Sequence, residues 1–226
     1  MNVPRRSAWR NNSLSIVFGL LLLAALTGQA LVGLAGYNEA ARTAGLAEIG
    51  LGRYLTSSSF AVDVAENWQS EYLQFTLYIL LTVWLVQKGS SESKKPEEAG
   101  LGSDRDQRVG LWATKKSPRP VRAGGIVSVL YSSSLTVLMA TIFFLSWAAQ
   151  AVTGRVANNE ERFRDLLDPQ SLGQYLWDSD FWGRTLQNWQ SELLAVGSMA
   201  IFAVFLRQRG SPESKPVGAS HEETPD

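Results

Sequence analysis

The chain has 226 residues with equal numbers of basic and acidic side chains, 21 of each, no cysteine and a single histidine. Zero net charge gives no indication of a nucleic-acid-binding surface, so no nucleic-acid partner is expected. The lack of cysteine excludes disulfides and thiolate metal sites, and the histidine, His221, lies in a polar tail. No phosphate-binding glycine-rich loop, serine-nucleophile motif or zinc-protease motif is present. We therefore expect no enzymatic activity, no metal and no cofactor.

The N-terminal segment is basic and leads into an apolar run. Arg5, Arg6 and Arg10 precede residues 13–36, which carry no charge and are long enough to cross a hydrocarbon core of roughly 30 Å as a helix. A basic start before an apolar run is also typical of a signal peptide. The run is long for a signal peptide, and the same pattern returns in mid-chain. We therefore predict a transmembrane helix.

A second long helix is predicted after a polar stretch. The serines at 57–59 can cap a helix that continues to Gln87, with Gly89 directly after its end. The apolar part of this helix, residues 68–87, is a second predicted span. Trp68 then lies at the membrane–water interface, where indole rings prefer to be. Two further spans are predicted at 131–153 and 189–207 by the same criteria.

The sequence Asn-Trp-Gln-Ser-Glu occurs twice, at residues 67–71 and 188–192. An offset of 121 positions aligns residues 11–94 with 132–215 without a gap, and about a third of the pairs are identical. We interpret this similarity as an internal duplication. The predicted organisation is repeat unit 1 (residues 11–96), a disordered basic cytoplasmic linker (97–124), repeat unit 2 (125–216) and a disordered tail (217–226).

Each unit contains two predicted spans, so both units cross the membrane in the same sense, as a parallel repeat about an axis along the membrane normal. Basic residues are concentrated at the N-terminus, in the linker and after the fourth span, which predicts that both termini are cytoplasmic. The two outer loops share the pattern Leu-Gly-x-Tyr-Leu, at 51–55 and 172–176. This pattern predicts short interfacial helices, the alternative being ordinary loops with two apolar anchors.

The predicted fold class is therefore an all-α membrane protein with four transmembrane helices, formed by two parallel two-helix repeats, with short interfacial helices in the outer loops. The predicted location is the inner membrane of a bacterial cell. The expected partner is the lipid bilayer. Because four helices form a thin bundle, a transport function would require a dimer or a larger assembly of this chain, whereas a structural role does not require one.

The ionisable residues nearest the predicted membrane core are two glutamates, Glu71 and Glu192. A carboxylate inside a membrane is costly and therefore suggests a functional role. Counting along the helices places Gln29 level with Glu71, and Gln150 level with Glu192, so we expect a hydrogen bond within each pair. Such bonds between helices stabilise packing, and the alternative is an ion or proton site. The candidate polar patch is Gln29, Asn67, Glu71, Gln150, Asn188 and Glu192, and the candidate interface anchors are Trp68, Trp189, Tyr54 and Tyr175.

The repeated pentapeptide and the ending Arg-Gln-Arg-Gly-Ser-x-Glu-Ser-Lys-Pro at 207–216 give the chain a family resemblance. It resembles a family of uncharacterised bacterial membrane proteins known as a domain of unknown function, over residues 11 to about 216. The resemblance implies the architecture and no activity. We expect a non-enzymatic structural or envelope-associated membrane protein. The alternative is a small ion, proton or solute transporter or channel that uses Glu71 and Glu192 as an oligomer.

Overall fold

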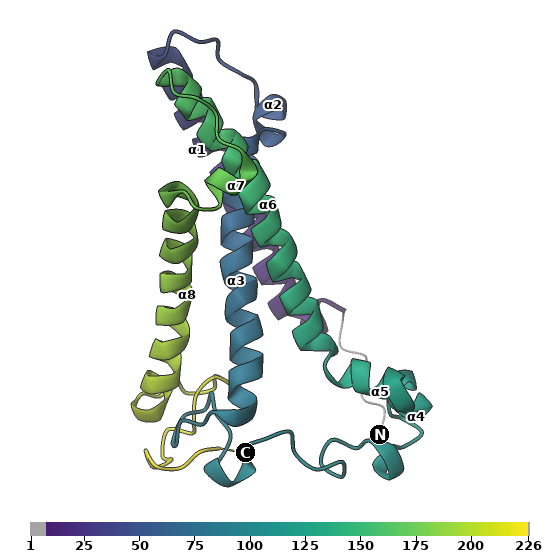
Figure 1. Cartoon of the computed structure of the whole chain (residues 1–226). Coiled ribbons are helices and arrows are strands. Elements are labelled where there is room, and N and C mark those ends of the chain that lie inside the picture. The colour runs from purple at the N-terminus through teal and green to yellow at the C-terminus, as the bar shows by residue number, and fades with distance from the viewer. Residues whose placement is uncertain (1–7, 226) are drawn as a thin grey trace.

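The computed structural model describes residues 8–225, which contain helices and irregular segments and no strand (Figure 1). The long helices are α1 (Ala8–Thr43), α3 (Ser58–Trp84), α6 (Ser134–Arg164) and α8 (Ser179–Phe205). The short ones are α2 (Leu51–Leu55), η1 (Pro96–Glu98), η2 (Gly110–Trp112), α4 (Arg119–Ala123), α5 (Gly125–Ser132) and α7 (Leu172–Tyr175). The all-helical class is confirmed.

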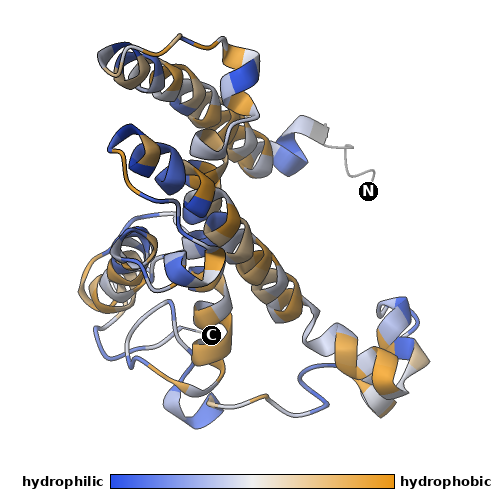
Figure 2. Ribbon diagram, turned by 45° about the horizontal axis from the view of Figure 1, so that its top comes forward, coloured by the Kyte–Doolittle hydropathy of each residue, from blue (hydrophilic) through white to orange (hydrophobic). Residues whose placement is uncertain are grey.

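Two of the long helices, α1 and α6, are long and apolar enough to cross a membrane. Their apolar side chains are largely exposed, for example Leu21 at 59% and Leu145 at 67%. Figure 2 shows apolar residues along much of the long helices and in the short helices that precede α6, and hydrophilic residues in parts of the connecting loops. An exposed apolar surface of this extent is typical of a surface that lipid or another protein covers.

The four long helices alternate in direction, with α1 and α6 running toward one end of the molecule and α3 and α8 running back (Figure 1). We call the end that holds α2 and α7 the outer end, and the opposite end, where α3 and α8 finish, the inner end. The helix α3 packs extensively against α6 and also contacts α8. The helix α1, in contrast, has its main helix contact with the short α2. The centre of the structure is therefore α3 between α6 and α8.

The start of α3 follows the prediction, and its end does not. The Ser57 hydroxyl accepts a hydrogen bond from the backbone N–H of Phe60 at 3.2 Å, which caps the helix. The helix stops at Trp84 rather than at Gln87. The reason is that the N–H of Gln87 donates to the hydroxyl of Ser93, at 2.8 Å, instead of to a helical carbonyl.

The inner end of α8 is built in the same way, 121 positions later. The helix ends at Phe205, before the predicted end at residue 207, and the N–H of Gln208 donates to the Ser214 hydroxyl at 2.8 Å. Gly89 and Gly210 both adopt left-handed backbone angles, φ 86° and 83°, in the turns that follow. Gly89 therefore serves a turn beyond the helix and not the position directly after its end.

The third predicted span is longer than expected and begins after a break. The helix α5 ends at Ser132, and α6 starts at Ser134 and continues to Arg164, beyond the predicted boundary at residue 153. The extra turns are used at the outer end. The Asn159 side chain there donates to the carbonyl of Gln170 at 3.0 Å and accepts from its N–H at 2.7 Å.

Both outer loops are fastened by one set of contacts. Asn38 bonds both backbone groups of Ile49, at 3.0 and 2.9 Å, as Asn159 does with Gln170. The short helices α2 and α7 lie at the predicted positions. Each contributes a buried tyrosine that packs against a glycine of the preceding long helix, Tyr54 against Gly33 and Tyr175 against Gly154.

The predicted linker contains η1, η2 and α4, and most of its residues are exposed. The segment after α8 folds back against the inner end of the bundle. The buried ammonium of Lys215 donates to the carbonyls of Ser220, His221 and Glu223, at 3.0–3.1 Å. The Thr224 hydroxyl accepts from the N–H of Gly89 at 2.7 Å. The mobility of the linker and the tail in solution stays a prediction.

The tyrosine–glycine contacts give a direct test of the outer packing. A Cβ added at Gly154 would overlap the Tyr175 hydroxyl, whereas one added at Gly28 of α1 meets nothing within 4 Å. We expect Gly154→Ala to lower the free energy of unfolding by about 1–3 kcal/mol. Gly28→Ala is the matched control and should be neutral or stabilise by up to about 1 kcal/mol through helix propensity. Thermal unfolding of the detergent-purified protein measures both, and equal stabilities would contradict the packing described.

Candidate functional site

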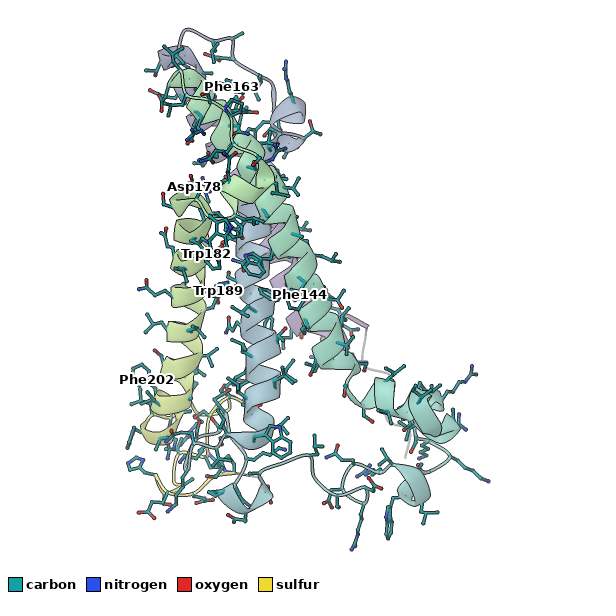
Figure 3. All side chains as sticks on the ribbon, viewed as in Figure 1. Phe144, Phe163, Asp178, Trp182, Trp189 and Phe202 are labelled. Carbon is teal, nitrogen blue, oxygen red and sulfur yellow. The ribbon has the colours of Figure 1, made fainter. Side chains whose placement is uncertain are left out.

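The two copies of Asn-Trp-Gln-Ser-Glu meet where α3 and α8 pack together. The indole N–H of Trp189 donates to the side-chain oxygen of Gln69 at 2.8 Å, and Gln69 is fully buried. Figure 3 shows Trp189 and Trp182 on the side of α8 that faces its neighbouring helices. A hydrogen bond inside an apolar contact stabilises the pairing, because separation would leave both polar groups without a partner. The repeated motif therefore joins helices in this structure.

The helices α6 and α8 are joined by a second buried bond and by aromatic contacts. The amide of Gln150 donates to the Thr185 hydroxyl at 3.2 Å, and both side chains are fully buried. The Trp147 ring stacks on Phe181, with centroids 6.1 Å apart, and lies 5.9 Å from the Trp189 ring. Such aromatic pairs contribute about 0.5–1.5 kcal/mol each beyond the area they bury.

The corresponding positions between α1 and α3 have different residues. At the offset of 121, Thr185 corresponds to Val64, and Trp147 corresponds to Leu26. Gln29, which corresponds to Gln150, is half-buried and makes no hydrogen bond within the described part of the chain. The Thr185 hydroxyl and the Trp147 ring, which join α6 to α8, thus have no counterpart in the first pair of helices. Their absence is consistent with the sparse packing of α1 against α3.

The expected hydrogen bonds between glutamates and glutamines are not formed among residues 8–225. Gln150 bonds Thr185 instead of Glu192, and Thr185 lies seven residues before Glu192, about 10 Å further along the helix. The depth estimate was wrong because α6 is inclined to α8, so equal distances along the chain do not give equal heights (Figure 1). Glu71 is exposed and Glu192 is half-buried, on the two helices that the bond from Trp189 to Gln69 joins.

The remaining residues of the predicted patch are used locally. Asn67 donates to the carbonyl of Asp63 at 2.7 Å, and Asn188 donates to the carbonyl of Arg184 at 2.9 Å, each one turn back on its own helix. Of the predicted anchors, Tyr54 and Tyr175 are buried, Trp189 is half-buried and Trp68 is 44% exposed. Their level relative to a bilayer stays a prediction.

A charged cluster around Arg184 is the feature that the sequence reasoning missed. The guanidinium of Arg184 on α8 lies 3.1 Å from Glu66 and 3.5 Å from Asp63, both on α3, and 3.2 Å from Asp180 on its own helix. A signal was present in the sequence, because the offset of 121 positions aligns Asp63 with Arg184, which has the opposite charge. Opposite charges at equivalent positions are expected to pair where two copies face each other.

Partial burial sets the electrostatics of the charged cluster. Burial raises the pKa of Asp63 and of Glu66 above their ordinary values, and the positive charge of Arg184 offsets only part of this effect. Burial, together with the hydrogen bond that its hydroxyl donates to Asp180 at 2.8 Å, raises the pKa of Tyr175. The cluster thus connects α3, α7 and α8 at the outer end.

A cavity of about 270 Å³ adjoins the charged cluster at the outer end. Four long helices line it with charged and aromatic groups, among them Tyr37, Asp63, Glu160, Glu161, Arg164 and Arg184. The Arg164 guanidinium lies over the Tyr37 ring, 5.7 Å from its centroid, and this contact holds the outer end of α1 against α6. The cavity has both signs of charge and the volume for a few water molecules or a small zwitterion.

Removal of the central cation tests the role of the charged cluster. We expect Arg184→Gln to lower the free energy of unfolding by about 1–3 kcal/mol at pH 7, because Asp63 and Glu66 lose their partner. Arg42→Gln is the control, since Arg42 and Glu48 are well exposed, and it should change stability by less than about 1 kcal/mol.

The pH dependence of the same variant gives a second readout. Because the folded-state pKa values of Asp63 and Glu66 are raised, protonation favours the folded state, and this stabilisation is lost as the pH rises through those values. Wild-type stability should therefore increase from pH 7 toward pH 5, and more steeply in Arg184→Gln, which lacks the charge that lowers both pKa values. Denaturant unfolding at the two pH values measures this, and a slope unchanged by the substitution would contradict it.

Comparison with known proteins adds a family and no activity. Neither the curated proteins nor the solved structures include a match to the chain. One family model matches residues 5–226, nearly the whole length. The chain therefore belongs to the family described as a domain of unknown function (DUF6766).

Proposed function

We propose that the protein is a non-enzymatic, four-span integral membrane protein of the bacterial inner membrane, built by duplication of a two-helix unit, with a structural role in the cell envelope. The observation that carries this proposal is the buried bond from Trp189 to Gln69. It uses the most distinctive motif of the sequence to hold two helices together. Polar contacts between helices have this packing role in membrane proteins.

Four spans are supported by the length and charge of the helices. Besides α1 and α6, which are apolar along most of their length, α3 and α8 have 27 residues each and reach about 40 Å. From Trp68 to the end of α3 the only ionisable carboxyl is Glu71, and from Trp189 to the end of α8 it is Glu192. The alternating directions of the four helices agree with successive crossings (Figure 1).

Duplication is supported by contacts that recur at the offset of 121 positions. The asparagine bonds to the outer loops, the tyrosine–glycine contacts and the serine bonds at the inner ends each occur once per unit. Three separate kinds of contact at equivalent positions are more than a shared amino-acid composition would produce. Parallel units of this kind are related by an axis along the membrane normal.

The membrane orientation is proposed from basic residues. The linker has several lysines and arginines, and Arg207, Arg209 and Lys215 follow α8 directly. These residues lie at the inner end, which we assign to the cytoplasm. The short helices α2 and α7 then lie at the outer membrane surface. Leu51 of α2 and Leu172 of α7 are each 40% exposed and are suited to an interfacial position.

Cysteine labelling tests the topology in a chain that has no native cysteine. Ser58→Cys, at the start of α3, should react with a membrane-impermeant maleimide in intact cells. Ser103→Cys, in the linker, should react only after the cells are permeabilised, because the linker is cytoplasmic in this orientation. Labelling of Ser103→Cys in intact cells would refute the proposed topology, and labelling of neither variant after permeabilisation would show that the sites are covered.

A transport function is the second candidate, and one observation favours it. Glu71 and Glu192, one from each copy of the motif, lie on α3 and α8 within three residues of the bond from Trp189 to Gln69. Paired carboxylates within a membrane can bind a proton or a cation. The charged cavity at the outer end provides a polar region above them.

Flux and stability measurements separate the two candidates. For a structural role, we expect vesicles containing the protein to take up Na⁺, K⁺ or H⁺ no faster than protein-free vesicles. The double variant Glu71→Gln/Glu192→Gln should then be as stable as the wild type or more stable, because two like charges are removed. Wild-type flux that disappears in this double variant, with stability kept, would decide for transport.

A further inference from the structure

One face of α8 is exposed although the equivalent face of α3 is buried. On α3 this face is buried, with at most 8% exposure, at Val62, Ala65, Gln69, Ser70 and Thr76. On α8 the equivalent positions are Gly183, Leu186, Gln190, Ser191 and Gly197, and we call these five residues the open face. All but Gly197, which is half-buried, are exposed.

What covers the buried face of α3 indicates what would fit the open face. The helices α6 and α8 of the second unit pack against α3. Their equivalents in the first unit are α1 and α3. The buried face of α3 is covered by α6 and α8, and the first unit carries the equivalents of these two helices. We therefore expect a first unit to fit the open face of α8.

The first unit of the same chain is not placed to cover the open face. The outer end of α1 is held beside α6 by the Arg164–Tyr37 contact and is tied to α2 by Tyr54 against Gly33. Leu22 and Ala25 of α1 are exposed, whereas their equivalents on α6, Phe143 and Ser146, are buried. The chain thus leaves one surface of α1 and one surface of α8 exposed. The equivalent surfaces, on α6 and α3, are buried inside the chain.

The polar groups of the two exposed surfaces are complementary. Gln190 is exposed on α8, and Trp68 is 44% exposed on α3, with no hydrogen bond to its indole within residues 8–225. Their equivalents, Gln69 and Trp189, form the 2.8 Å bond inside the chain. An amide that faces hydrocarbon without a partner is costly. The same indole–amide bond formed between two chains would remove this cost.

The charges also fit a second copy. In the chain, Arg184 lies against Asp63 and Glu66 of the first unit. When the same geometry is applied to the open face, the Asp63–Arg184 pair is replaced by Arg184 of one copy and Asp63 of the next, because the two residues are equivalent positions. Arg184 therefore faces an acidic residue both inside the chain and in the contact between two copies.

We propose that the open face of α8 binds the first unit of a second copy of this chain, α1 together with α3, so that Trp68 of one copy donates to Gln190 of the next. The inference rests on the duplication in the proposed function. The contact is head-to-tail, because different surfaces of the two copies meet, and contacts of this type close into a ring when the rotation permits.

Cross-linking between differently tagged copies tests the interface. A chain with Trp68→Cys and a chain with Gln190→Cys are co-expressed and treated with a short bismaleimide. We expect a product that carries both tags, and none when either variant is expressed alone. Gln69→Cys/Trp189→Cys in one chain is the positive control, because that pair is in contact inside the chain.

Two results overturn the proposal: no product with both tags while the positive control cross-links, or a Trp68→Cys/Gln190→Cys double variant that cross-links only within one chain. Ser58→Cys and Ser103→Cys labelling reads the topology independently. Expected labelling without a cross-link between chains therefore rejects this interface and leaves the four-span architecture standing.

A measurement of mass does not depend on the cysteine variants folding. The wild type in lipid nanodiscs should have the mass of two or more chains, and Gly197→Trp should reduce it to one chain by obstructing the open face. Gly28→Trp is the control, since neither glycine has a neighbour within 4 Å and the equivalent of Gly28, Ala149, is exposed on α6. A wild type with the mass of one chain, or equal masses for the two variants, contradicts the proposal.

Discussion

The contact of α3 with α6 and α8 determines how the other helices are placed, and the buried bond from Trp189 to Gln69 lies inside it. Within an apolar environment, a polar side chain contributes directional stability only where its partner is present. The repeated Asn-Trp-Gln-Ser-Glu segment supplies an indole donor on one helix and an amide acceptor on the other. Sliding or rotating α8 against α3 would break this bond, so the register of the two helices is specified.

The two units have the same contacts at their outer and inner ends and different contacts in the middle of their helices. Asn38 and Asn159 hold the outer loops in the same way, and the serine bonds end α3 and α8 alike. In the middle, Trp147 joins α6 to α8 by contacts with Phe181 and Trp189, whereas the first unit has Leu26 at the position of Trp147. The two units therefore have equivalent contacts where the chain turns, and they differ in some of the contacts between their helices.

Much of the fold could be predicted from the sequence, because long helices follow from uncharged apolar runs and from capping residues such as Ser57. The short helices α2 and α7 were predicted from a five-residue pattern that recurs. Helix ends were less accurate, since the hydrogen bond from Gln87 to Ser93 depends on a turn that returns from six residues ahead. Periodicity along a helix carries no information about such a return.

The candidate site was predicted less well than the fold. Its residues were chosen by depth along each helix, and the inclination of α6 moved Gln150 to Thr185 and away from Glu192. The charged cluster was missed because Asp63 and Arg184 are ordinary charged residues in sequence and acquire a role only when the two units face each other. Reading equivalent positions of a repeat for complementary charge would have identified this pair.

The fold of the segment after α8 has a consequence for the order in which the protein is made. The inner end of α3 is completed by Thr224, and the Lys215 ammonium is satisfied by carbonyls of residues 220–223. All of these residues leave the ribosome after α8. In the proposed four-span arrangement, α1 and α3 enter the membrane early in synthesis, but the contacts at their inner end form only after α6 and α8 have followed. Closure of the inner end is thus a late step of biogenesis that depends on both halves of the chain.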